Sequence, residues 1–175
     1  MKNYLKKLKL IDTFSTEIEI SRDEFVEKLT AIVDKGSIGL FSDPFEMLTS
    51  GKNEYKGQVN FEGFEIRKRR RFFDTSSSLS RAEGTFSEQN NKLRIDTEVN
   101  SLGGFTTFIL AFLVIFYLGI VITIMGSDDE ASFIVIPFIL IHGSLMLSIP
   151  YFMIKRSVQK LKYDLEREFV FITKK

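Results

Sequence analysis

Cysteine is absent from this chain of 175 residues, and histidine occurs once. The lack of cysteine excludes disulfide bonds and thiolate metal sites, although it does not identify a cellular compartment. The glycines never assemble into a phosphate-binding loop, and the carboxylates are scattered along the chain. A catalytic site needs an acid, a base or a nucleophile that converge in one place. We therefore expect no enzyme activity, no metal and no cofactor.

Charged residues are missing from two long apolar runs in the C-terminal half. The first run, Phe105 to Met125, contains no ionisable group except Tyr117, and the second is Phe133 to Ile154. At ~1.5 Å per residue, each forms a helix that crosses the roughly 30 Å hydrocarbon core of a bilayer. Two buried helices of a soluble core would instead need a polar face or a much larger protein around them. The two runs predict a transmembrane helical hairpin.

Lysine and arginine are distributed unevenly around the predicted hairpin. The link between the spans, Gly126 to Ser132, contains three acidic residues and no basic one. The basic residues that flank the other ends of the spans are Lys92, Arg94, Lys155, Arg156, Lys160 and Lys162. The positive-inside rule then predicts cytoplasmic arms, cytoplasmic termini and a link that faces out. Met1 to Ile11 has no uninterrupted apolar segment and no cleavage site, so we expect no cleaved signal peptide.

Tyr117 and His142 are a polar pair within the predicted spans. His142 lies nine residues in from the outer end of the second span, and Tyr117 lies at a similar depth in the first. This depth allows a hydrogen bond between the tyrosine hydroxyl and the imidazole. The pair either joins the two helices as neutral groups or forms a proton-linked or pH-sensing site. With so few polar groups, two spans from one chain form no pore, so a role beyond anchoring requires partners.

The residues before the hairpin predict a small α+β domain. Apolar and polar residues alternate from Leu10 to Ile20, as in a half-buried strand. Ser21 to Glu24 form a capping box, which begins a helix over Arg22 to Asp34. After a loop from Lys35 to Asn53, the alternation from Glu54 to Asn100 predicts an antiparallel meander of about four strands. One strand, one helix and this meander are enough for a single core.

The residues after the second span predict a helical extension into the cytosol. Val158, Leu161 and Leu165 continue a helical stripe, and basic residues occupy the other faces. Phe169 to Thr173 either completes this helix or adds a strand to the domain. The predicted organisation is therefore a cytosolic domain over 1–102, a hairpin over 103–154 and a basic amphipathic segment over 155–175.

The densest positive charge is a run of five residues at the end of a predicted strand. Its members are Arg67, Lys68, Arg69, Arg70 and Arg71. With Lys155 and Arg156, this run is a candidate site for a protein partner or for anionic lipid headgroups, which attract basic residues near a membrane. Alternatively, the run is a solvated edge strand or pairs with acids of neighbouring strands. Those acids are Glu62, Glu65 and Glu83. We expect no nucleic-acid binding, because no aromatic side chains interleave within the run.

The order of these features resembles a group of known proteins. After the strand and the capped helix come Tyr55-Lys-Gly57 and Phe61-Glu-Gly-Phe64-Glu-Ile66, then Gly84, the strand from Leu93 to Val99 and the hairpin. This order resembles uncharacterised small bacterial two-span membrane proteins, some of which have sheets likened to pleckstrin-homology folds. The resemblance covers most of the chain and implies a bacterial inner membrane, but it brings no functional site.

Two functions fit these observations. In the first, the chain is a membrane-anchored cytosolic module that binds a protein, a second copy of itself or anionic lipid headgroups. In the second, it is an accessory subunit of a transporter or another membrane complex, and its hairpin is a surface for packing against other helices.

Overall fold

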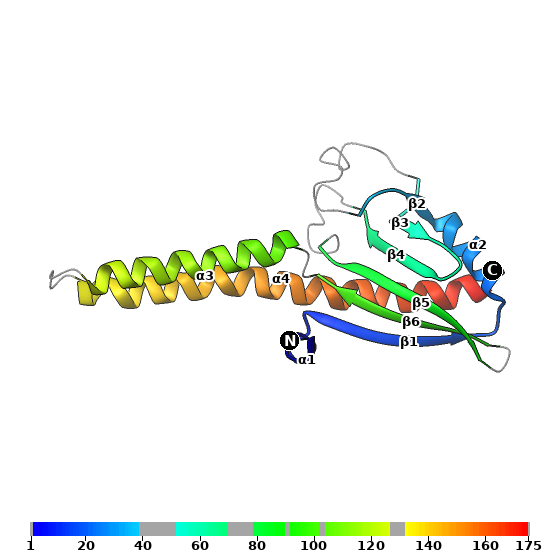
Figure 1. Ribbon diagram of the computed structural model, residues 1–175, viewed down its shortest axis with the longest axis horizontal. Coiled ribbons are helices and arrows are strands. Elements are labelled where there is room, and N and C mark those ends of the chain that lie inside the picture. The colour runs from blue at the N-terminus through cyan, green and yellow to red at the C-terminus, as the bar shows by residue number, and fades with distance from the viewer. Residues whose placement is uncertain are drawn as a thin grey trace. The chain divides into compact units, whose positions relative to one another are not determined.

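The computed structural model describes residues 2–38, 52–69, 79–89, 92–101, 104–126 and 132–174. It is an α+β fold with a six-stranded mixed sheet and a long C-terminal helix (Figure 1). The chain forms two compact units: the sheet unit, Met1–Ser101 with Ile154–Lys175, and the helical unit, Leu102–Met153. The predicted C-terminal segment 155–175 falls within Ile154–Lys175, which is part of the sheet unit.

The sheet has the strand order β1-β6-β5-β4-β3-β2. Its strands are β1 (Ile11–Ile18), β2 (Val33–Lys35), β3 (Tyr55–Val59), β4 (Gly63–Lys68), β5 (Arg81–Gln89) and β6 (Lys92–Asn100). Neighbouring strands are antiparallel except for β2 and β3, which are parallel. The predicted meander is confirmed as β3 to β6, and the predicted first strand pairs with β6 as an edge of the sheet.

Helix α2 (Arg22–Ile32) begins where the capping box predicts. The Ser21 hydroxyl accepts a hydrogen bond from the backbone N–H of Glu24 at 3.2 Å. The predicted end at Asp34 is wrong, because Val33 is already extended and pairs with Tyr55. Val33 follows Leu29 at helical spacing, so its burial looks in the sequence like that of a helical residue. In the structure it is buried as part of β2, and the parallel pairing of β2 with β3 is a contact that local spacing does not reveal.

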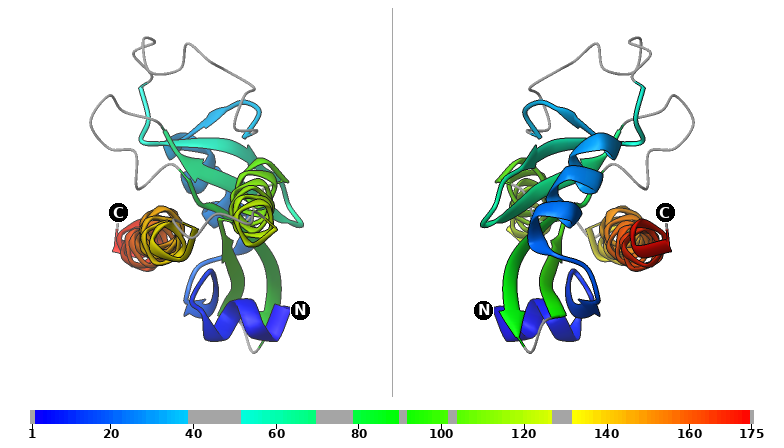
Figure 2. Two further views of the ribbon diagram at one scale, coloured as in Figure 1. Left: turned by 90° about the vertical axis from the view of Figure 1, so that its left-hand side faces the viewer. Right: turned by 90° about the vertical axis from the view of Figure 1, so that its right-hand side faces the viewer.

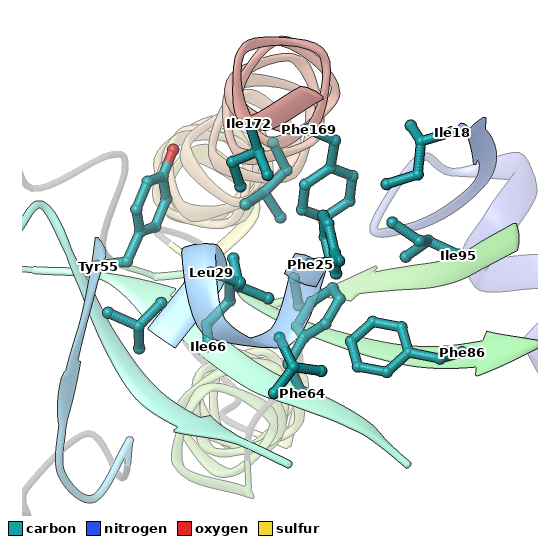
Figure 3. Close-up of a cluster of buried hydrophobic side chains, with 14 of the residues drawn as sticks. Ile18, Phe25, Leu29, Tyr55, Phe64, Ile66, Phe86, Ile95, Phe169 and Ile172 are labelled. Carbon is teal, nitrogen blue, oxygen red and sulfur yellow. The ribbon is translucent and has the colours of Figure 1, made fainter. Parts of the chain in front are cut away.

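The core lies on the face of the sheet that α2 and the end of helix α4 (Ser132–Lys174) cover (Figure 3). Phe169 of α4 is fully buried, and its ring centroid lies 5.5 Å from that of Phe25 and 5.8 Å from that of Phe64. The other buried apolar residues of this part of α4 are Ile154, Val158, Leu161, Leu165 and Ile172. Phe169 to Thr173 is therefore helical, and the predicted stripe on α4 packs into the core of the sheet unit.

The helical unit consists of α3 (Gly104–Met125) and the first part of α4, which lie side by side (Figure 1, Figure 2). None of the side chains described from 107 to 126 is buried, and between 135 and 153 only Gly143 is. A Cβ at Gly143 would lie 3.0 Å from the ring of Tyr117, so glycine allows this close approach. By length and composition, both helices are long and apolar enough to cross a membrane.

Candidate functional site

The described members of the basic run lie at the end of β4 and make contacts within the sheet unit. Lys68 Nζ lies 2.6 Å from an oxygen of Asp164 on α4 and 2.8 Å from one of Glu54. Arg69 Nη1 lies 2.7 Å from a carboxylate oxygen of Asp34 on β2. Arg67 is buried and donates a hydrogen bond to the backbone oxygen of Lys68. Part of the run therefore links strands and helix by ion pairs.

These partners differ from the acids that the sequence suggested. Glu65 and Glu83 contact Arg81 instead, at 3.6 and 3.2 Å. Arg70 and Arg71 lie outside the described residues. Asp164 is separated from Lys68 by 96 positions, so no local pattern in the sequence connects them.

Burial and charge together set the protonation of this cluster. Burial alone would lower the pKa of Lys68, but its contacts with Asp164 and Glu54 outweigh that effect and raise the pKa above its ordinary value. Tyr55, at the start of β3, is 3% exposed. Its burial raises the pKa of the phenol, and the nearby charges of Asp164 and Glu168 raise it further. At neutral pH the cluster holds a charged lysine beside a neutral tyrosine.

Lys155 and Arg156 do not join Lys68 in one cluster. They follow the buried Ile154, and Lys155 is half-buried whereas Arg156 is exposed. Asp164, the partner of Lys68, lies roughly 13 Å further along the axis of α4 than Lys155, at 1.5 Å per residue. The two groups of basic residues therefore occupy different places on the sheet unit.

Tyr117 and His142 are in contact in the helical unit. The tyrosine Oη and the histidine Nδ1 lie 2.7 Å apart, so the structure contains the hydrogen bond that their depth allowed. The rings of Phe138 and His142 are stacked, with centroids 6.5 Å apart. The imidazole is exposed on the surface of the helical unit. The contact joins α3 to α4, and it leaves one imidazole edge facing outward.

Three buried serines form a polar contact that the sequence did not indicate. The hydroxyl of Ser80 donates to that of Ser157 at 2.7 Å and is also in contact with the hydroxyl of Ser101. Ser80 precedes β5, Ser101 follows β6, and Ser157 lies on α4. Serine is small, and the hydroxyl of one serine can form a hydrogen bond with that of another. The cluster therefore lets α4 approach the ends of β5 and β6 closely without leaving a buried hydroxyl unpaired.

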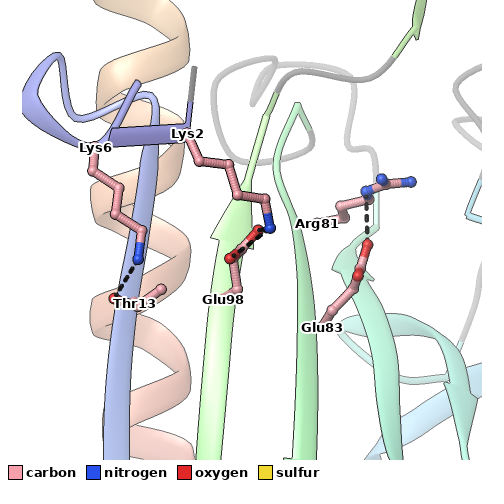
Figure 4. A network of polar contacts seen from close by, with 6 residues as sticks. All are labelled: Lys2, Lys6, Thr13, Arg81, Glu83 and Glu98. Atoms are coloured by element: carbon pink, nitrogen blue, oxygen red, sulfur yellow. Dashed lines mark hydrogen bonds and ion pairs between the residues drawn. The ribbon is translucent and has the colours of Figure 1, made fainter. Parts of the chain in front are cut away.

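The face of the sheet opposite the core carries a row of acidic residues. Strand register places Glu98 opposite Glu83 and Glu83 opposite Glu65, and we call these three residues the acidic row. Like charges directly opposite each other are unfavourable unless they are neutralised. Lys2 lies 3.1 Å from Glu98, and Arg81 contacts Glu83 (Figure 4). Arg81 also contacts Glu65. Shallow hollows flank this row, and Glu83, Gly84 and Thr85 line both of them.

Neither a metal site nor a known relative assigns a function to these groups. Among the residues that the structure describes, no three His, Asp or Glu side chains gather as metal ligands. The chain matches no known family model, no curated protein and no solved structure at a significant level. The resemblance to small two-span membrane proteins therefore stays a prediction.

Proposed function

We propose that the chain is a membrane-anchored interaction module, in which the helical unit crosses the bilayer and the sheet unit binds a protein partner. The observation that carries this proposal is the change of environment along α4. From 135 to 153 its side chains are mostly exposed and apolar, whereas Ile154, Val158 and Leu161 are buried among the strands. One helix thus belongs to both units.

A bilayer accounts for the exposed apolar surface of the helical unit. The described side chains of α3 from 107 to 125 carry no charge and none is buried. Exposing large apolar side chains costs about 25 cal/mol per Å² in water, so a surface of this kind requires a cover. Lipid provides that cover, and the helices satisfy their own backbone hydrogen bonds within it.

The acidic row supports a protein partner that is basic where it meets the sheet. Glu83 is exposed, and its cross-strand neighbours Glu65 and Glu98 repel it. Lysine or arginine from a partner would reduce this repulsion and would give the contact its specificity. The ion pairs of the acidic row with Lys2 and Arg81 are solvent-exposed, so they neutralise the row only weakly. In contrast, Lys68 and Arg69 are mostly buried against their carboxylate partners, which argues against the basic run as the main binding surface.

Membrane fractionation and crosslinking test the two parts of the proposal separately. The full chain should stay in membranes washed with alkaline carbonate and should be released by detergent. A photo-crosslinking residue at Thr85, beside the acidic row, should then capture a discrete protein adduct in cells. The same residue at Gln159, exposed on α4, is the control and should not. Release by carbonate would refute the anchor, and equal labelling at both positions would refute the binding surface.

A second function is favoured by the contact between Tyr117 and His142. In this alternative, the chain is an accessory subunit, and the exposed imidazole edge packs against a helix of another membrane protein. His142→Leu should then reduce recovery of the complex in mild detergent, whereas Leu140→Ala, at another exposed position of α4, should not. A strictly monomeric chain that His142→Leu leaves unchanged would dispose of this alternative.

A further inference from the structure

Helix α1 (Lys2–Lys7) is a short basic helix with little protein packed against it. All six of its residues are described, and none is buried. Tyr4 is 75% exposed, and Leu8, just beyond the helix, is 44% exposed. Helices shorter than about 12 residues are marginal in water on their own, so a six-residue helix needs contacts from elsewhere. Such contacts within the described protein are few.

A defined turn fixes α1 against the start of β1. The N–H of Leu10 donates to the carbonyl of Leu5 and the N–H of Lys9 to that of Lys6, both at 3.0 Å, which is the Schellman pattern of a helix end. Lys9 has a φ of 56°, in the left-handed region where glycine is usual. Leu10 and Ile11 then enter the sheet unit as buried residues. A lysine therefore occupies a position whose backbone favours glycine, and it adds a positive charge there.

This end of the sheet unit is the end from which the chain leaves for the helical unit. Ile11 pairs with Asn100, the last residue of β6, and α3 begins at Gly104. Lys2 contacts Glu98, and Lys6 Nζ lies 3.5 Å from the Thr13 hydroxyl (Figure 4). Ile11, four positions after the end of α1, is thus paired with a residue four positions before the start of α3.

We propose that α1 lies in the headgroup layer and binds anionic phospholipid. The lysines contact phosphate groups, and Tyr4 and Leu8 contact the boundary between headgroups and acyl chains, as in other amphipathic segments at interfaces. The lysines of this patch are Lys6, Lys7 and Lys9, since Lys2 is paired with Glu98. The inference rests on the proposed anchoring by the helical unit, and it places the lipid contact at α1 rather than at the basic run.

The absence of tryptophan from the chain allows a direct test. Tyr4→Trp gives a single fluorophore in the full chain, which is reconstituted into vesicles of phosphatidylcholine with or without phosphatidylglycerol. In the anionic vesicles, we expect blue-shifted emission and quenching by lipids brominated on the upper acyl chain, both weakened by high salt. Phe61→Trp is the matched control, because Phe61 is an aromatic residue, 61% exposed, in the turn between β3 and β4. It should show neither effect.

Lys9→Gly separates charge from structure. Glycine fits the left-handed turn, so this change keeps or improves the helix end while it removes one charge. In the Tyr4→Trp background, the ratio of lipid-docked to free α1 in anionic vesicles should fall about fivefold, as expected for one lysine. In phosphatidylcholine vesicles the ratio should not change.

Flotation of the vesicles distinguishes the failures. A chain that does not float with vesicles would overturn both the anchor and the lipid contact. A chain that floats but shows unquenched Tyr4→Trp emission in anionic vesicles would overturn the lipid contact alone. Equal quenching with and without phosphatidylglycerol would also overturn the assignment to anionic headgroups.

Discussion

Phe169 is the largest side chain that α4 buries fully against the sheet. Its ring contacts Phe14, Phe25 and Phe64, which come from β1, α2 and β4. Phe169→Ala should lower the free energy of unfolding by about 3–5 kcal/mol, because it opens a cavity where three elements meet. Phe171→Ala is the control, since that ring is half exposed on the same helix, and we expect a change below ~1 kcal/mol. Denaturant unfolding in detergent, followed by circular dichroism, would measure both, and equal losses would contradict this assignment.

Tyr55 should make the sheet unit sensitive to alkaline pH. Because the pKa of its phenol is raised in the folded protein, the folded form keeps the proton to higher pH than the unfolded chain does. This contribution to stability is complete below the ordinary pKa of 10.0 and is lost as the pH rises above it. In Tyr55→Phe, the free energy of unfolding should therefore fall less steeply above pH 10, by up to about 1.4 kcal/mol per pH unit.

The raised pKa of Lys68 also makes stability fall as the pH rises. Lys68 is present both in the wild type and in Tyr55→Phe, so its contribution cancels when the two are compared. Tyr163→Phe is the matched control, because Tyr163 is 64% exposed. Thermal unfolding measured at a series of alkaline pH values would show the difference. If Tyr55→Phe and wild type lost stability in parallel, burial of the phenol would not be the cause.

At the scale of elements, sequence patterns predicted the parts that depend on near neighbours. Alternation indicated β1 and the meander, and Ser21 indicated the start of α2. The predicted end of α2 was wrong because Val33 pairs with Tyr55 of β3, which lies more than 20 positions away in the sequence. In the candidate site, the depth of Tyr117 and His142 indicated their contact, since two antiparallel helices fix their separation. The ion pair of Lys68 with Asp164 could not be predicted, because it depends on how α4 packs across the sheet.

The serine cluster should limit how large a side chain α4 can carry where it meets β5 and β6. Ser157 is fully buried beside Ser80. Ser157→Leu should destabilise the protein by about 1–3 kcal/mol, because the larger side chain forces the helix away from the strands. Ser157→Ala should cost only about 0.5–1.5 kcal/mol, the value of one hydrogen bond. Gln159→Leu, exposed on the same helix, is the control, and a similar loss in that variant would refute the steric explanation.

At the scale of the whole molecule, two distant segments build one core. Residues from β1 and α2 contact Phe169, although the helical unit separates them in the sequence. A bilayer cannot divide a shared core, so both segments lie on the same side of any membrane that the chain spans. An even number of crossings must therefore occur between Ser101 and Ile154. The pair formed by α3 and the first part of α4 supplies two crossings. This conclusion rests on the shared core and does not depend on the positive-inside rule.

The distribution of charge then predicts which side each part occupies. The link from Gly126 to Ser132 is acidic, and the basic residues lie in the sheet unit, so the positive-inside rule places the sheet unit in the cytoplasm. A reporter that is active only in the cytoplasm should work at Lys175 and fail in the link, and a reporter that is active only outside should do the reverse. A fusion at Met1 is the internal control, because it must agree with Lys175. If the link and Lys175 reported the same side, α3 and α4 would not cross the membrane as a pair. A reversed pattern would keep the hairpin and overturn its orientation.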